Sequence, residues 1–314
     1  MFFKNYHYFL AIVDNGGLSK AAEVLYLSQP SLSKYVSKLE EELGVQLFDH
    51  TSSPLRLTYA GQRYYAYAKR IQSLDRQFED ELSSLRNDES GQIRIGIAQW
   101  RGSILLPTLI PAFQTRYPHF RIEVLEGRAK QIEAALVQGQ VDLCLMNLPS
   151  HYPSQTIQQI IWNERMLLVG NRKHPVVAKA IAELPVGADG YRQIDIRFLE
   201  NEHFISLKPG QNMTVATEQL FAAHSVTPKS TWSTENISTA LNMVSRGMGF
   251  TMMPEAGARI PFLPEDLEFF SVSHAEQLFS FAAVYRKDFV PTRQIQTLLE
   301  LARDIYAAPQ EGKK

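Results

Sequence analysis

The chain has 314 residues, of which 45% are hydrophobic and 21% charged, and its formal net charge is −1 at pH 7. This length suits two or three domains, and the composition excludes a disordered chain, a collagen and a coiled-coil rod. A single cysteine, Cys144, excludes a disulfide framework and a cysteine-based zinc site within one chain, and no apolar run reaches the roughly 18 residues that span a bilayer. Because the apolar run at 9–13 is also too short for a signal peptide, we expect a cytoplasmic protein with no membrane partner.

The first 87 residues show helical periodicity almost throughout. Apolar residues over 2–13 define one helix face, and Asn15-Gly16-Gly17 ends that helix. A second helix is predicted around 21–25, and Ser28-Gln29-Pro30 opens a third, because proline is tolerated in a first helical turn. The inner stripe of this third helix is formed by Leu32, Val36, Leu39 and Leu43. Two short helices of this kind predict a helix-turn-helix.

The outward face of the third predicted helix carries short hydrogen-bonding groups and cations, which suit the floor of the DNA major groove and its phosphates. Three acids, Glu40 to Glu42, cluster at its C-terminal end, so we expect the N-terminal half to face DNA. The residues predicted to bind DNA are Lys20, Ser28, Gln29, Pro30, Ser31, Ser33, Lys34, Lys38, Thr51 and Arg56. A solvated amphipathic helix is the alternative interpretation of the same face.

Two short strands, at 45–48 and 55–58, flank a polar loop and predict a wing, which completes a DNA-binding domain over residues 1–58. A helix without internal proline follows over 59–87, and apolar residues recur along it every seven positions at Tyr64, Ile71, Phe78 and Leu85. Tyr67 and Leu74 supply the second position of this seam, and Leu82 continues it with a slip of one residue. A heptad repeat is typical of helix pairing between subunits. At roughly 40 Å the helix outreaches a small winged domain, so we interpret it as a linker and dimerisation helix rather than one packed on its own domain. The polar segment 88–91 predicts a hinge.

Beyond the hinge, short β-branched runs alternate with helical stretches, which predicts parallel sheets with right-handed crossovers. The predicted strands lie at 93–97, 121–126 and 141–146, then at 204–207, 229–232, 249–253 and 279–285. The predicted helices lie at 104–117, 131–138, 214–223, 237–245 and 292–306. This pattern indicates two α/β lobes, lobe I over 92–163 plus 271–308 and lobe II over 164–270. The segment 180–201 is either a loop over the cleft between the lobes or a decoration.

Ligands of such sheets bind at the carboxyl ends of strands, beside helix N-termini. The residues predicted to contact a ligand there are Gln99, Trp100, Arg101, Ser103, Arg128, Met146, Asn147, Lys208, Gln211, Asn212, Glu235 and Phe250. Three cations among them, Arg101, Arg128 and Lys208, favour an anionic ligand such as a carboxylate. Trp100 and Phe250 suit stacking on an aromatic ring.

The N-terminal residues resemble the LysR-type transcriptional regulators. The matching runs are Leu18-Ser19-Lys20-Ala21-Ala22, Leu27-Ser28-Gln29-Pro30-Ser31-Leu32-Ser33, Leu39-Glu40-Glu41-Glu42-Leu43-Gly44, Leu47-Phe48 and Leu57-Thr58-Tyr59-Ala60-Gly61. The resemblance implies a winged helix-turn-helix, a dimerisation helix and a two-lobed, periplasmic-binding-protein-like effector domain. It also implies a dimer of dimers that binds promoter DNA, responds to a small-molecule effector and contacts RNA polymerase. The wing departs from the family, because His50 and Ser53 stand where arginines are usual and only Arg56 remains basic.

Two other classes of function compete with this interpretation. An enzyme is disfavoured, because the sequence has no Gly-x-Ser-x-Gly, no His-Glu-x-x-His and no phosphate-binding loop, and Met252 replaces the third glycine after Gly247 and Gly249. A transport solute-binding protein is disfavoured by the winged region. We therefore predict a regulator that is not an enzyme and needs no cofactor or metal. Cys144, among apolar neighbours, is expected to be a buried small hydrophobe rather than a redox sensor.

Overall fold

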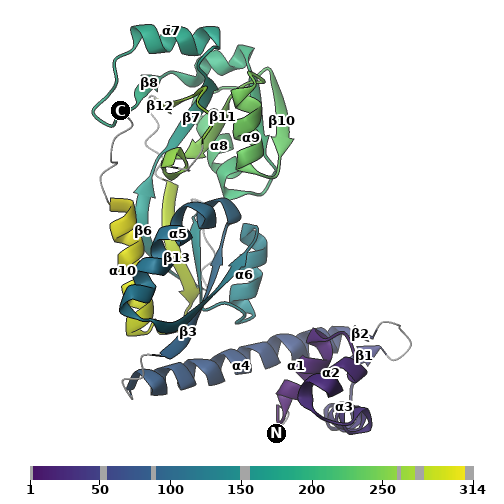
Figure 1. The fold of residues 1–314 in the computed structure, drawn as a ribbon. Coiled ribbons are helices and arrows are strands. Elements are labelled where there is room, and N and C mark those ends of the chain that lie inside the picture. Colours follow the sequence, from purple (N-terminus) through teal and green to yellow (C-terminus); the bar gives the residue numbers. More distant parts are fainter. Residues whose placement is uncertain are drawn as a thin grey trace. The chain divides into compact units, whose positions relative to one another are not determined.

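The computed structural model describes residues 3–49, 55–85, 90–148, 156–259, 263–272 and 279–307. The chain divides into two compact units (Figure 1). The first comprises Met1–Asn87 with Ala134–Gln140, and the second comprises Asp88–Glu133 with Val141–Lys314. Within the described ranges, no helix is both long and apolar enough to cross a membrane.

The N-terminal unit is a winged helix-turn-helix followed by a long helix. Its elements are α1 (Tyr6–Asp14), α2 (Leu18–Leu25), α3 (Gln29–Leu43), β1 (Phe48–Asp49), β2 (Arg56–Leu57) and α4 (Tyr59–Leu85). The side-chain oxygen of Ser28 accepts the N–H of Ser31 at 3.3 Å and caps α3, and Gly44 ends this helix with a left-handed φ of 69°. Thr58 caps α4 by accepting the N–H of Gly61 at 3.0 Å. The predicted starts of the third helix after Ser28 and of the long helix at residue 59 are confirmed.

The core of this unit is aromatic. The ring of Phe9 lies 5.1 Å from Phe48 and 4.7 Å from Tyr64, and all three side chains are buried. Burying a side chain of this size stabilises a fold by about 1.5–3 kcal/mol. Asp14 of α1 then accepts hydrogen bonds from Tyr65 and from Lys69, each at 2.7 Å, so the first half of α4 is fastened to the helix-turn-helix.

Lobe I of the second unit contains one five-stranded sheet with the strand order β4-β3-β5-β13-β6. Its strands are β3 (Ser90–Ile97), β4 (His119–Glu126), β5 (Leu143–Asn147), β6 (Thr156–Glu164) and β13 (Phe279–Arg286). β3 runs parallel to β4 and β5, whereas β13 runs antiparallel to β5 and β6. Helices α5 (Gln99–Arg116) and α10 (Arg293–Ala307) share one core with Ile93, Ile95 and Ile97 and lie side by side (Figure 1).

The opposite face of this sheet meets α6 (Ala129–Val137). Gly96 makes this close packing possible, because a Cβ at that position would lie 3.1 Å from the Cys144 sulfur and 3.3 Å from the Cβ of Ile132. Helices therefore cover both faces of the lobe I sheet, as a doubly wound α/β layer requires.

Lobe II is built on a four-stranded sheet with the order β11-β7-β12-β8, and β9 pairs in parallel with β10 beside it. Its strands are β7 (Met166–Asn171), β8 (Arg192–Ile194), β9 (His203–Leu207), β10 (Ser230–Thr234), β11 (Thr251–Pro254) and β12 (Leu267–Val272). Its helices are α7 (Pro175–Glu183), η1 (Ile196–Asn201), α8 (Asn212–Ala223), α9 (Ile237–Ser245) and η2 (Glu255–Arg259). A bridge between Phe204 and Phe250 joins β9 to the residue before β11, so the two groups of strands form one layer.

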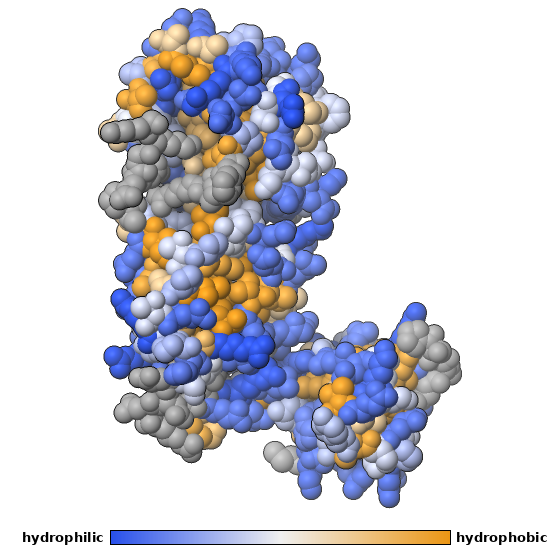
Figure 2. All heavy atoms as spheres, in the orientation of Figure 1, coloured by the Kyte–Doolittle hydropathy of each residue, from blue (hydrophilic) through white to orange (hydrophobic). Residues whose placement is uncertain are grey.

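Figure 2 shows that hydrophilic residues cover much of the visible face of each unit, while hydrophobic residues gather over α2 and over lobe I. On α2, Val24 is 57% exposed. Both units thus have the polar exterior expected of a folded globular protein, with local apolar patches.

The fold class is as predicted, but several elements differ. α5 begins at Gln99 rather than at 104 and contains both Pro107 and Pro111. β6, β7, β8 and β12 were not predicted, and the sheets of both lobes are mixed rather than parallel. β3 takes in Ser90 and Gly91, which we expected in the hinge. The segment 180–201 forms the end of α7, β8 and η1, and it does not line the cavity described below.

Candidate functional site

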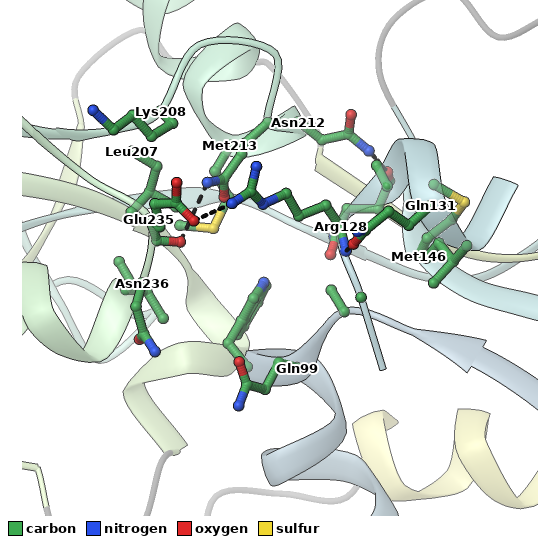
Figure 3. A pocket seen from close by; sticks show the side chains of 18 of the residues that line it. Gln99, Arg128, Gln131, Met146, Leu207, Lys208, Asn212, Met213, Glu235 and Asn236 are labelled. Atoms are coloured by element: carbon green, nitrogen blue, oxygen red, sulfur yellow. Dashed lines mark hydrogen bonds and ion pairs between the residues drawn. The ribbon is translucent and has the colours of Figure 1, made fainter. Parts of the chain in front are cut away.

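A cavity of about 990 Å³ lies between lobes I and II. Lobe I contributes the segments that follow β3, β4 and β5, and lobe II contributes those that follow β9 and β10. The predicted residues that line it are Gln99, Trp100, Ser103, Arg128, Met146, Asn147, Lys208, Gln211, Asn212 and Glu235 (Figure 3). The volume is within the range of small-molecule sites. The cavity lies at the ends of strands, where the sequence predicted a ligand site.

Four helices begin at this cavity, and they differ in how their first amides are satisfied. Asn236 caps α9 by accepting the N–H of Ser238 at 2.8 Å, and the Gln131 side chain accepts the N–H of Arg128 at 3.0 Å before α6. In contrast, no side-chain capping hydrogen bond is made, among the described residues, by the N-cap residues of α5 and α8, which are Ala98 and Gln211. One uncapped helix N-terminus from each lobe therefore faces the cavity, and each carries a partial positive charge.

Charged side chains of both signs line the cavity. Arg128 of lobe I and Glu235 of lobe II form a direct ion pair across it (Figure 3), with 61% and 55% of their side chains exposed. The ammonium group of Lys208 donates to the side-chain oxygen of Ser233 at 3.2 Å. Lys130 and Glu126 complete the charged lining, which gives three cations against two carboxylates.

Arg101 does not line the cavity, contrary to our prediction, because α5 begins early and turns this residue inward. It is fully buried and forms an ion pair with Glu164. It also donates to Asn147 at 2.7 Å and to the Tyr306 hydroxyl at 2.9 Å. Its guanidinium lies 4.2 Å from the ring centroid of Trp100. Burial disfavours the charge, but Glu164 and Tyr306 outweigh it, so the pKa of Arg101 lies above its ordinary value.

Glu164, which sequence reasoning missed, is the centre of this network. It is the last residue of β6, and the next strand, β7 of lobe II, begins at Met166. Its carboxylate accepts the Asn147 amide at 2.9 Å and the backbone N–H of Ala256, between β11 and β12, at 3.0 Å. The backbone oxygen of Asn147 accepts the Asn212 amide at 2.5 Å. The network therefore joins both lobes beside the cavity.

Phe250 is also absent from the cavity wall. It is fully buried in the lobe II core, where its ring lies 4.9 Å from His174 and 5.1 Å from Phe198. Gly170 leaves room for it, because a Cβ there would lie 2.7 Å from the Phe250 ring. The aromatic groups that do line the cavity are Trp100 and Phe279, and Phe279 was not predicted because it enters from the returning strand β13.

The helix-turn-helix presents most of its predicted DNA-binding residues to solvent. The exposed ones are Lys20, Ser28, Gln29, Pro30, Ser31, Ser33, Lys34, Lys38 and Arg56. Thr51 lies outside the described residues, as do His50 and Ser53. Glu40 is not part of a solvated acidic face, because it accepts the backbone N–H groups of Leu47 at 2.6 Å and Phe48 at 3.0 Å and so fixes the first strand of the wing to α3.

The predicted seam on α4 begins later than expected. Tyr64 is buried in its own unit, stacked on Phe3 at 4.8 Å, whereas Phe78 is 61% exposed and Ile71 is half-buried. The Leu85 side chain lies outside the described residues. Four residues of the predicted seam, Tyr67, Ile71, Leu74 and Phe78, form a stripe on one face of the helix, because their spacing is four, three and four residues. We call these four residues the α4 stripe.

Two family models cover this chain. The model described as "Bacterial regulatory helix-turn-helix protein, lysR family" matches residues 3–62, and "LysR substrate binding domain" matches residues 86–307. The chain belongs to the LysR family. It is a LysR-type transcriptional regulator with a helix-turn-helix DNA-binding domain and an effector-binding domain, and it is not an enzyme.

Known LysR-type regulators match over most of this chain. YcgK of Bacillus subtilis, an uncharacterized HTH-type transcriptional regulator, is 31% identical over 255 residues, or 79% of this chain and 78% of that protein. BenM of Acinetobacter baylyi is 27% identical over 311 residues, or 97% of this chain and 96% of that protein. The full-length BenM structure has a TM-score of 0.58 at 26% identity, covering 96% of this chain and 95% of that one. A full-length OxyR variant from Pseudomonas aeruginosa shares the fold, with a TM-score of 0.74 at 23% identity and 94% and 92% coverage.

Cys144 of this LysR-type regulator is a buried residue of β5. Burial raises the pKa of its thiol far above the ordinary value, and the thiol donates to the backbone oxygen of Ile132 at 3.4 Å. It therefore packs as a small hydrophobic side chain against α6. No cluster of three or more His, Cys, Asp and Glu suited to a metal occurs in the part of the chain that the structure describes.

Proposed function

We propose that this LysR-type regulator responds to a small anionic effector that binds in the cavity between lobes I and II. The observation that carries the proposal is the pair of uncapped N-termini of α5 and α8, which face one cavity from opposite lobes. Backbone N–H groups at a helix N-terminus bind anions such as carboxylates and phosphates. Closure of the lobes on the effector would then bring both N-termini toward its charge.

The side chains support a carboxylate or a similar oxyanion. Arg128 and Lys208 approach the cavity from different lobes, and both are exposed within it. Trp100 and Phe279 supply apolar surface for the body of the ligand. We therefore propose Gln99, Trp100, Ser103, Arg128, Met146, Asn147, Lys208, Gln211, Asn212 and Glu235 as the effector-contacting set, without Arg101 and Phe250.

Thermal unfolding of the full-length protein against a panel of metabolites tests this proposal. A ligand at 100 times its dissociation constant stabilises the folded state by about 2.7 kcal/mol, which corresponds to a shift of about 5–11 °C for a domain of this size. Carboxylates are expected to produce the shift, and Arg128→Ala and Lys208→Ala are expected to reduce it. Lys179→Ala, on the exposed face of α7, is the control. Stabilisation by neutral compounds that is insensitive to Arg128→Ala and Lys208→Ala would contradict an anion site.

We also propose that the DNA surface comprises the N-terminal half of α3 together with Lys20 of α2 and Arg56 of β2. Its support is the exposure of Ser31, Ser33 and Lys34 on the face opposite the core. Small polar groups there let the helix approach base edges, and the lysines suit phosphates. In this proposal the protein binds promoter DNA in the cytoplasm. Contact with RNA polymerase is proposed from the family resemblance alone.

Dimerisation through the α4 stripe is a further part of the proposal. Tyr67, Leu74 and Phe78 are 47%, 48% and 61% exposed, which is unusual for large apolar side chains in a regular pattern. A second α4 would bury them in coiled-coil fashion. We propose a dimer formed in this way and a dimer of dimers as the DNA-bound assembly.

A further inference from the structure

The ion pair between Arg128 and Glu235 spans the proposed effector cavity. Arg128 stands in the link between β4 and α6, and Glu235 stands in the link between β10 and α9. Figure 3 shows the Arg128 side chain extending across the cavity to the Glu235 carboxylate. The Arg128 guanidinium, to which an anionic effector would bind, is thus already paired with the carboxylate of Glu235.

We infer that Glu235 is a built-in competitor for the effector's anionic group, and that the effector binds Arg128 by displacing it. This inference rests on the proposed anion site. Glu235 would then determine how tightly an anion binds and which charges are accepted, since a ligand must offer Arg128 a better partner than the carboxylate it loses. Removing the negative charge of Glu235 should therefore strengthen anion binding.

Within each lobe, a hydrogen bond holds the backbone at its end of the ion pair, so the two side chains can separate without a local backbone rearrangement. The backbone N–H of Arg128 is held by Gln131, and the backbone oxygen of Glu235 accepts the Gln211 amide at 3.2 Å. Each side chain is more than half exposed, so water can solvate both charges when the pair opens. Exposed ion pairs stabilise a protein only weakly, by at most about fivefold in an equilibrium constant.

Lys208, the cation that lobe II contributes to the cavity, is not held in this way. The Lys208 ammonium has a neutral partner, Ser233, at 3.2 Å. A hydroxyl group does not cancel the charge of an ammonium group. An entering anion therefore meets Lys208 and the α8 N-terminus of lobe II as available positive charge, and it gains Arg128 of lobe I when Glu235 leaves. The displacement links anion binding to the contact between the lobes.

Sulfate titration of the full-length protein, at constant ionic strength and followed by calorimetry, tests the inference. Glu235→Gln keeps the size of the side chain and removes its charge, and we expect it to bind sulfate about two- to fivefold more tightly than the parent protein. Arg128→Gln should bind sulfate more weakly. The matched control is Asp266→Asn, which breaks a similarly exposed ion pair with Lys173 at 3.1 Å inside lobe II and should leave sulfate affinity unchanged.

Different results would overturn the competitor role of Glu235 and the proposed anion site. Equal or weaker sulfate binding by Glu235→Gln would overturn the competitor role while leaving the anion site in place, provided that Arg128→Gln still weakens binding. Sulfate binding that neither Arg128→Gln nor Lys208→Gln weakens would overturn the anion site itself, and the inference with it.

A ligand-free measurement gives a second test. Because Cys144 is the single cysteine and is buried, cysteines introduced at Gln114 of lobe I and Ala178 of lobe II, both exposed, can carry spin labels. The interlobe distance distribution, measured after dilution with unlabelled protein, should broaden in Glu235→Gln relative to the parent and to Asp266→Asn. Identical distributions in all three proteins would overturn the link between displacement of Glu235 and the contact between the lobes.

Discussion

Replacing Arg101 with methionine should be among the most destabilising single changes in the effector domain. The guanidinium has no exposed surface, and its removal leaves the Glu164 carboxylate buried with only Asn147 and the Ala256 N–H as donors among the contacts described. Breaking one side of a buried ion pair costs about 3–5 kcal/mol. For a domain of this size, that lowers the midpoint of thermal unfolding by about 6–20 °C.

The double variant Arg101→Met with Glu164→Met separates the loss of packing from the loss of charge. Replacing both members of a buried pair with apolar groups removes the uncompensated charge, so the double variant should be more stable than Arg101→Met alone. Lys173→Met is the control, because the exposed Lys173–Asp266 pair contributes only about 0–1 kcal/mol.

Chemical denaturation of the four full-length proteins, followed by tryptophan fluorescence, measures these differences. Trp100 stacks on the Arg101 guanidinium at 4.2 Å and so reports on this site. Our reasoning would be refuted by an Arg101→Met variant that loses less than about 1 kcal/mol, the loss typical of an exposed pair. A double variant that is no more stable than Arg101→Met would also refute it.

Three further predictions concern the N-terminal unit. Lys34→Ala should weaken DNA binding and lower its salt slope by about one ion without changing the hydrodynamic size, and dissociation of the oligomer would contradict its place on the DNA face. Phe78→Glu should split dimers when mass is measured by light scattering, and an unchanged mass would argue against the α4 stripe. Burial and a hydrogen bond to Asp75 raise the pKa of Tyr6 to about 12, so the folded state binds its proton more tightly than the unfolded state. Stability should therefore fall as pH rises from about 10 to 12, less steeply in Tyr6→Phe, and an unchanged slope in denaturation series would contradict this.

The DNA-binding unit was predictable in detail because its signals are local. Ser28 and Pro30 mark the start of α3, Gly44 marks its end, and Thr58 caps α4, and each of these signals acts within a few residues. The start of α5 was not predictable in this way. Ala98 gives no capping signal, and Pro107 and Pro111 disfavour a continuous helix from Gln99. The helix forms nevertheless, because its apolar face packs against β3 and α10 in one core.

The cavity was predictable in position and less so in its charged residues. Strand ends located Arg128, Lys208 and Glu235, because parallel strands place their following loops at one edge. The same rule placed Arg101 beside them, but a helix turns successive side chains by about 100°, and its third residue points inward. Glu164, its partner, is distant in sequence and carries no local signal, so only the folded chain brings the pair together.

The position of β13 in lobe I bears on how this protein folds as it leaves the ribosome. β13 lies between β5 and β6 in the sheet, and the last helix, α10, supplies Tyr306 to the Arg101 network. Every strand of lobe II is synthesised before β13. The nascent chain can therefore complete lobe II while lobe I still lacks an inner strand and its covering helix. A premature stop before β13 would release a chain with an intact helix-turn-helix, a foldable lobe II and an open, apolar lobe I, which is a substrate for chaperones and proteases rather than a shortened regulator.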